Sequence, residues 1–119
     1  MGGILVLNMN ISESEKRVYI NVSGYINKRD ANNFLNNYKQ TMKNKKASLY
    51  KLIVSPDFFE CEDEEDIKRI CMTFYKSGFK KMYLVDKDNY IMSNLTLKPM
   101  EKKLFQKAVK VVRSIEDTK

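Results

Sequence analysis

The chain of 119 residues contains no histidine and no tryptophan, and it is poor in cysteine, proline and glycine. Without histidine it lacks the commonest general base, the usual partner of a serine or cysteine nucleophile, and most zinc-binding patterns. Two cysteines are too few for a structural zinc site. The four glycines complete neither a GxGxxG, a P-loop nor a GxSxG motif. We therefore predict that the protein is not an enzyme, and we predict no catalytic residue, cofactor or metal ion.

Length and composition predict one domain spanning residues 1–119, because 43% hydrophobic residues suffice for a single core. Cys61 and Cys71 are ten residues apart, and on one helix they would be separated by about 15 Å. A disulfide requires Cα atoms within about 7 Å, so we expect two reduced thiols. The apolar run from Ile4 to Leu7 is too short for export or for spanning a membrane. We expect a cytoplasmic protein without membrane association.

Hydrophobic periodicity predicts the order β-β-α-β-α-β-(β)-α. The predicted strands are 3–11, 17–26, 48–55 and 81–85, with either a short strand or an irregular connection at 90–97. The first helix is predicted within 27–46, where Asn27 or Asp30 can cap its start. The second ends at Ser77–Gly78, and the last begins near Pro99 and runs to about Ile115.

The predicted third strand, 48–55, has a nearly continuous apolar run, which is typical of a strand covered on both faces. We expect Pro56 to end it. A helix joins this strand to the fourth, and such a connection implies a right-handed parallel crossover. The fold class is therefore α/β, with a mixed four- to five-stranded sheet and about three helices packed against it.

An acidic cluster precedes the second helix and places six carboxylates in seven positions: Glu60, Glu62, Asp63, Glu64, Glu65 and Asp66. The alternating ligands and glycine turn of a cation-binding loop are absent. Carboxylates at a helix N-terminus meet unpaired N–H groups and the positive end of the helix dipole, so capping and solvation alone can explain two or three of them. Six acids exceed what capping needs, because repulsion among neighbouring carboxylates offsets part of the stabilisation. A docking surface for a basic protein partner accounts for the excess.

The remainder of the chain is strongly basic, since 22 basic residues stand against nine acidic residues outside the cluster and the net charge is +7. Lysine outnumbers arginine by 18 to 4, which favours a solvated surface over specific nucleic-acid contacts. The lysine-rich last helix could also pair with the acidic cluster of a second copy. A nucleic-acid-associated protein, and a small structural protein of a phage or mobile element, remain alternatives.

The order of elements resembles the STAS domain, the anti-sigma-factor-antagonist-like fold, over residues 17 to 112. Its signature Gly-x-(Leu/Ile)-Asp is matched by Gly24 to Asn27, with Asn in place of Asp. Ser55 falls near the strand-end Asp of the family. Asp63 and Glu64 fall where its Asp-Ser pair would lie, so the phosphorylatable serine is replaced. The resemblance implies a regulatory interaction module whose partner-binding helix end is permanently anionic, crudely like the phosphorylated form.

Overall fold

A computed structural model describes residues 6–94 and 96–119 and contains a five-stranded sheet. Its strands are β1 (Val6–Ser12), β2 (Arg17–Ile26), β3 (Lys51–Cys61), β4 (Lys81–Val85) and β5 (Val109–Val112). The α-helices are α1 (Lys28–Met42), α2 (Glu64–Ser77), α3 (Tyr90–Asn94) and α4 (Pro99–Ala108), and short 3₁₀ helices span Ala47–Leu49 and Ile115–Thr118. Among the described residues, no helix has the length and apolarity needed to cross a bilayer.

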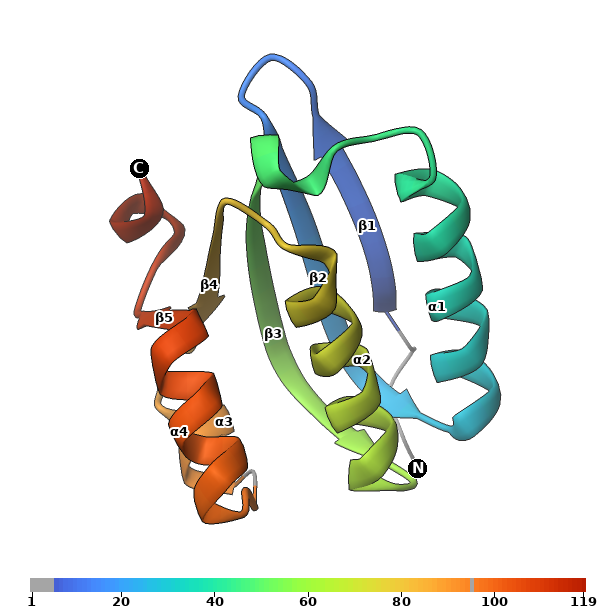
Figure 1. Ribbon diagram of the computed structural model, residues 1–119. Coiled ribbons are helices and arrows are strands. Elements are labelled where there is room, and N and C mark those ends of the chain that lie inside the picture. The colour runs from blue at the N-terminus through green and yellow to red at the C-terminus, as the bar shows by residue number, and fades with distance from the viewer. Residues whose placement is uncertain (1–5, 95) are drawn as a thin grey trace.

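The strands lie side by side in chain order, β1-β2-β3-β4-β5. β1 pairs antiparallel with β2, and the other three pairings are parallel. Each parallel crossover therefore moves one strand further in the same direction. Because such connections are right-handed, successive helices fall on the same face of the sheet. Figure 1 shows α1 and α2 side by side over that face, with α3 and α4 beside β4 and β5. The mixed sheet with its helices confirms the predicted α/β class.

Local signals explain the elements that were predicted well. In β2, Val18, Ile20 and Val22 are buried and alternate with more exposed residues. Asn27 caps α1: its side chain accepts from the Asp30 N–H at 2.8 Å, and the Asp30 carboxylate accepts from the Asn27 N–H at 3.2 Å. These reciprocal bonds form a capping box, so both predicted capping residues are used.

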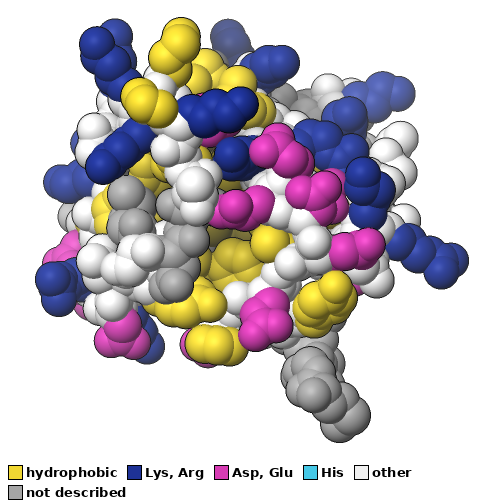
Figure 2. Space-filling model, turned by 90° about the horizontal axis from the view of Figure 1, so that it is seen from below, with side chains coloured by type: hydrophobic (Ala, Val, Ile, Leu, Met, Phe, Trp, Pro, Cys, Tyr) yellow, Lys and Arg dark blue, Asp and Glu magenta, His cyan; other side chains and the backbone are white. Residues whose placement is uncertain are grey.

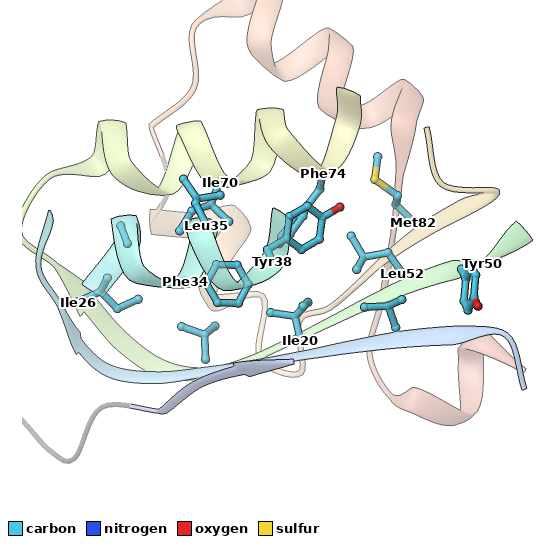
Figure 3. Close-up of a cluster of buried hydrophobic side chains, with 13 residues drawn as sticks. Ile20, Ile26, Phe34, Leu35, Tyr38, Tyr50, Leu52, Ile70, Phe74 and Met82 are labelled. Carbon is cyan, nitrogen blue, oxygen red and sulfur yellow. The ribbon is translucent and has the colours of Figure 1, made fainter. Parts of the chain in front are cut away.

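The main core lies between the sheet and helices α1 and α2 (Figure 3). Phe74 of α2 packs edge-on against Phe34 and Tyr38 of α1, with ring centroids 6.1 and 5.2 Å away. Leu52 of β3 belongs to this cluster. The two helices are thus joined to each other as well as to the sheet.

The opposite face of the sheet carries a smaller cluster of Ile53, Tyr83, Val85 and Val112. Leu52 and Ile53 are neighbours on β3 and belong to opposite clusters, which confirms that this strand is covered on both faces. The C-terminal 3₁₀ helix is fastened to β2, since the buried Arg17 guanidinium donates to the Thr118 hydroxyl at 2.8 Å and to the Thr118 carbonyl.

The prediction that Pro56 ends the third strand is wrong, because β3 continues to Cys61. Pro56 lies opposite Val22, where the β2–β3 register shifts, and β4 pairs with β3 only over Lys51–Val54. A residue without an N–H is tolerated at such an irregularity and where one neighbouring strand is missing. The premise that both cysteines lie on one helix is also wrong, since Cys61 ends β3 and Cys71 lies on α2.

The C-terminal region differs from the prediction in two places. The segment 90–97, predicted as a short strand or an irregular connection, contains the short helix α3. Residue 95 of this segment and residues 3–5 of the predicted first strand lie outside the described residues. The last helix stops at Ala108 rather than near Ile115. Val109–Val112 instead pairs parallel with β4, because this valine-rich segment suits a strand and the edge of β4 offers it a partner.

Candidate functional site

The acidic cluster spans the junction of β3 and α2, at the end of the molecule shown in Figure 2. Glu60 lies near the end of β3, and Glu62 and Asp63 form the turn. Glu64, Glu65 and Asp66 occupy the first turn of α2. Glu60, Glu62, Asp63 and Glu65 are exposed and Glu64 is half-buried. Figure 2 shows acidic side chains gathered around a hollow with an apolar floor.

Asp63 is the N-cap of α2. Its extended backbone, with φ −143° and ψ 120°, allows its side chain to accept from the Glu65 N–H at 3.0 Å. This bond satisfies one of the N–H groups that a helix leaves unpaired at its start. The sequence interpretation of helix capping therefore holds for this residue.

Replacing Asp63 with alanine removes this cap, and we expect it to lower the free energy of unfolding by about 1 kcal/mol. Asp63→Asn is the matched control, since the amide oxygen still accepts the bond and only the charge is lost. We expect the asparagine variant to lose no more than a few tenths of a kcal/mol. Urea unfolding followed by circular dichroism measures both. Equal losses for the two variants would show that charge, not capping, is the contribution of Asp63.

Glu62 connects the turn to the other helix of the main core. Its carboxylate accepts from the Lys28 N–H at the start of α1, at 3.3 Å, and its own N–H donates to the Ile26 carbonyl at 2.8 Å. The Glu62 carboxylate thus pairs with an N–H group at the start of α1, although it lies next to the cap of α2. The helix dipoles of both helices favour negative charge here.

Glu64 and Glu65 reach the C-terminal part of the chain. The Glu64 carboxylate accepts from the Thr96 N–H at 2.8 Å. Glu65 lies 3.4 Å from the ammonium of Lys68, and the same ammonium lies 3.3 Å from Glu101 on α4. Two polar links therefore join the first turns of α2 to the segment containing α4.

Asp66 differs from the other five acids because only 4% of it is exposed. Its Oδ1 lies 3.3 Å from the Arg69 guanidinium, which also donates to Asn32 of α1 at 2.6 Å. Its Oδ2 has no hydrogen-bond partner among the described residues. Asp66 was predicted to belong to the docking surface, but a buried side chain cannot contact a partner. We therefore define the acidic surface as Glu60, Glu62, Asp63, Glu64 and Glu65.

The thiol of Cys61 lies in the electrostatic field of this cluster. Burial raises its pKa above the usual value, and the charges of Glu64, Asp63 and Asp66 raise it further. Because the thiolate is the reactive form, this environment suppresses nucleophilic chemistry at Cys61. Within residues 6–94 and 96–119, no group of three or more His, Cys, Asp or Glu residues is arranged to hold a metal ion.

Comparison with solved structures defines the fold. An uncharacterised protein of the DUF3478 family from Shewanella loihica PV-4, which has a SpoIIAA-like fold, superposes with a TM-score of 0.62 at 9% identity, covering 98% of this chain and 91% of that one. The fold is STAS-like. The anti-sigma factor antagonist SpoIIAA in its unphosphorylated form superposes with a TM-score of 0.59, also at 9% identity, over 95% of this chain and 93% of its own.

Two comparisons of the sequence itself gave no match. No protein-family model matches the chain, and no curated protein matches it. At this low identity the STAS-like neighbours establish the arrangement of strands and helices and not a shared activity. The function must therefore be argued from the chain's own side chains.

Proposed function

We propose that this STAS-like protein is a non-catalytic protein-interaction or assembly module that binds a basic protein surface through the acidic surface. The proposal rests on one observation, the convergence of five carboxylates, four of them exposed and one half-buried, at one end of the molecule. The structure of SpoIIAA, an anti-sigma factor antagonist, supports a regulatory role on this fold. The residue composition supports an absence of catalysis, since histidine is missing and no nucleophile motif is present.

Hydrogen bonds within the chain account for only part of the acidic surface. Asp63 caps α2, Glu62 accepts from the start of α1, and Glu64 accepts from Thr96. Within the described part of the chain, the Glu60 side chain makes no hydrogen bond or ion pair, and the exposed Glu65 side chain has only its pair with Lys68. Exposed pairs of this kind contribute little to stability. Repulsion among neighbouring carboxylates is relieved when a basic surface covers them, which favours docking.

Electrostatic docking of this kind has a defined signature. Opposite charges across an interface raise the association rate, and salt screens them beyond about 8 Å at physiological ionic strength. A partner held by the acidic surface should therefore bind more weakly as salt rises. A second copy of this chain can supply the basic surface through Lys102, Lys103 and Lys107 of α4, all of which are exposed.

The test compares the wild type with Glu60→Gln/Glu62→Gln/Glu65→Gln. Glutamine keeps an acceptor oxygen for the Lys28 N–H and removes only charge. A partner is captured from native lysate, identified and purified, and its affinity is then measured directly. Light scattering of the isolated chain shows whether the partner is a second copy. We expect the variant to bind at least about tenfold more weakly, because several charge pairs are lost.

A matched control removes two exposed acids elsewhere, Asp88→Asn/Glu116→Gln. We expect this control to retain wild-type affinity and both variants to retain wild-type circular dichroism. If the triple variant binds as tightly as the wild type, the acids serve only helix capping and solvation, and the docking proposal is wrong.

A further inference from the structure

A second feature of the molecule is an apolar groove of about 520 Å³, enclosed by α2 on one side and by the segment containing α3 and α4 on the other. Strands β3 and β4 contribute to its floor. Small-molecule sites in proteins commonly have volumes of about 300–1,000 Å³ and mostly apolar walls. The hollow with its apolar floor is visible in Figure 2. The walls include Cys61, Ile67, Cys71, Ile91, Leu104 and Phe105.

Helix α4 has an apolar face that the described residues bury only in part. None of its residues is buried, whereas α1 and α2 each bury several. Leu104 and Phe105 lie against the groove and remain half-exposed. An amphipathic helix gains stability by removing its apolar face from water, so an occupant of the groove would complete the packing of α4.

Two polar links join the walls of the groove and limit the shape of its occupant. The Lys68 ammonium of α2 lies 3.3 Å from Glu101 of α4, and Glu64 accepts from the Thr96 N–H at 2.8 Å. Both acids and Lys68 line the groove. A protein helix is about 10 Å in diameter, so one that crossed between α2 and α4 at these links would have to break them. A slender molecule can occupy the groove while the links stay intact.

Charge restricts the occupant further. Glu60, Glu64 and Glu101 line the groove, and among the described lining residues Lys68 is the one that is basic. That ammonium already pairs with Glu65 and Glu101. The Lys98 N–H and then Lys68 hold the pKa of Glu101 below its usual value, so Glu101 remains ionised at neutral pH. A carboxylate or phosphate on the ligand would be repelled by these acids.

We propose that this groove binds a slender apolar small molecule whose polar end is uncharged or cationic, in the manner of a single-chain alcohol or amine. The chain of the ligand lies against Leu104 and Phe105, and its polar end lies among the acids. The groove shares Glu60 and Glu64 with the acidic surface. The two proposals are nevertheless tested separately, because ligand binding is measured on the isolated chain without a protein partner.

The absence of tryptophan provides a clean test. Phe105→Trp places the variant's single tryptophan in the wall of the groove. This variant is titrated with decanol, decylamine and decanoate, which differ chiefly in their polar ends. Decanol is kept below its solubility limit, and the two ionic ligands are kept below the concentrations at which they form micelles. We expect saturable blue shifts of the emission with the alcohol and the amine, and binding of decanoate at least about tenfold weaker because of repulsion by the acids. Glu60→Gln should reduce this difference.

A blocking variant tests the location. In the Phe105→Trp background, Leu104→Lys introduces a charge into the groove, and Gln106→Lys introduces the same charge at an exposed neighbouring position outside the lining. We expect the first to weaken decanol binding by at least about tenfold and the second to leave it unchanged. Retained binding in Leu104→Lys would overturn the proposal. So would the absence of saturable binding, or equal binding of all three ligands, which indicates non-specific partitioning.

The wild-type protein offers a second measurement that needs no substitution. Both of its cysteines, Cys61 and Cys71, line the groove. We expect saturating decanol to slow their alkylation by N-ethylmaleimide severalfold, as followed by mass spectrometry, because the ligand covers the thiols. Unchanged alkylation at saturation would place the ligand elsewhere and overturn the proposal, even if Leu104→Lys fails to fold.

Discussion

Replacing Phe74 with alanine is expected to lower the free energy of unfolding by about 3–5 kcal/mol. Phe74 is 5% exposed and packs edge-on against Phe34 and Tyr38 of α1. Its loss leaves a cavity between the two helices that the surrounding side chains cannot fill. Domains of this size are stabilised by about 5–15 kcal/mol in total, so the variant should unfold at far lower urea concentration than the wild type.

The matched control is Tyr75→Ala at the next position of α2. Tyr75 is also aromatic but is 43% exposed, so we expect a loss below about 1 kcal/mol. Urea unfolding followed by circular dichroism measures both variants. Because α2 carries part of the acidic surface and one wall of the groove, Phe74→Ala should also weaken both of the proposed binding activities. Similar losses for Phe74→Ala and Tyr75→Ala would contradict the observed packing of α1 on α2.

The second large effect is expected on the opposite face of the sheet. Thr118→Val keeps the side-chain shape but removes the hydroxyl that accepts from Arg17 at 2.8 Å and donates to the Ile115 carbonyl at 2.6 Å. A buried guanidinium N–H would then have lost its acceptor. Leaving a charged donor unsatisfied is expected to lower the free energy of unfolding by about 2–3 kcal/mol. Urea unfolding and hydrogen exchange of residues 115–118 provide the measurement.

A double-mutant cycle separates the lost bond from the unpaired charge. Arg17→Met/Thr118→Val removes both polar partners and keeps the apolar stem of the arginine in place. We expect the double variant to be less destabilised than the sum of the single variants, because no buried donor is left unpaired. Additive losses would show that Arg17 and Thr118 contribute independently.

Sequence patterns predicted those elements that depend on neighbouring residues. The alternation in β2, the Asn27 capping box and the stop of α2 at Gly78 are local signals, and Gly78 adopts the left-handed φ of 77° that glycine permits. The end of β3 was not predictable in this way. Proline usually breaks a strand because it has no N–H to donate. Pro56 is tolerated inside β3 because β4 does not pair with this part of the strand and because the β2–β3 register shifts here.

The site was predicted in part for the same reason. A run of acids before a helical pattern locates its N-terminus, so the position of the cluster at the start of α2 was foreseeable. The burial of Asp66 depends on how α1 and α2 pack. The groove depends on how α2 and α4 are placed relative to each other, and the Lys68–Glu101 ion pair that links them joins distant parts of the chain. Neither feature has a local signal in the sequence.

The order of the strands also bears on how the chain folds during synthesis. Each strand pairs with the one before it, so the sheet can grow from β1 to β5 in the order in which the ribosome releases them. Arg17 is the exception, because its acceptor Thr118 lies 101 residues later. Until Thr118 emerges, the Arg17 guanidinium must remain hydrated, so water cannot be fully excluded from the second face of the sheet. The docking of residues 115–118 therefore completes the burial of Arg17 after the strands have paired.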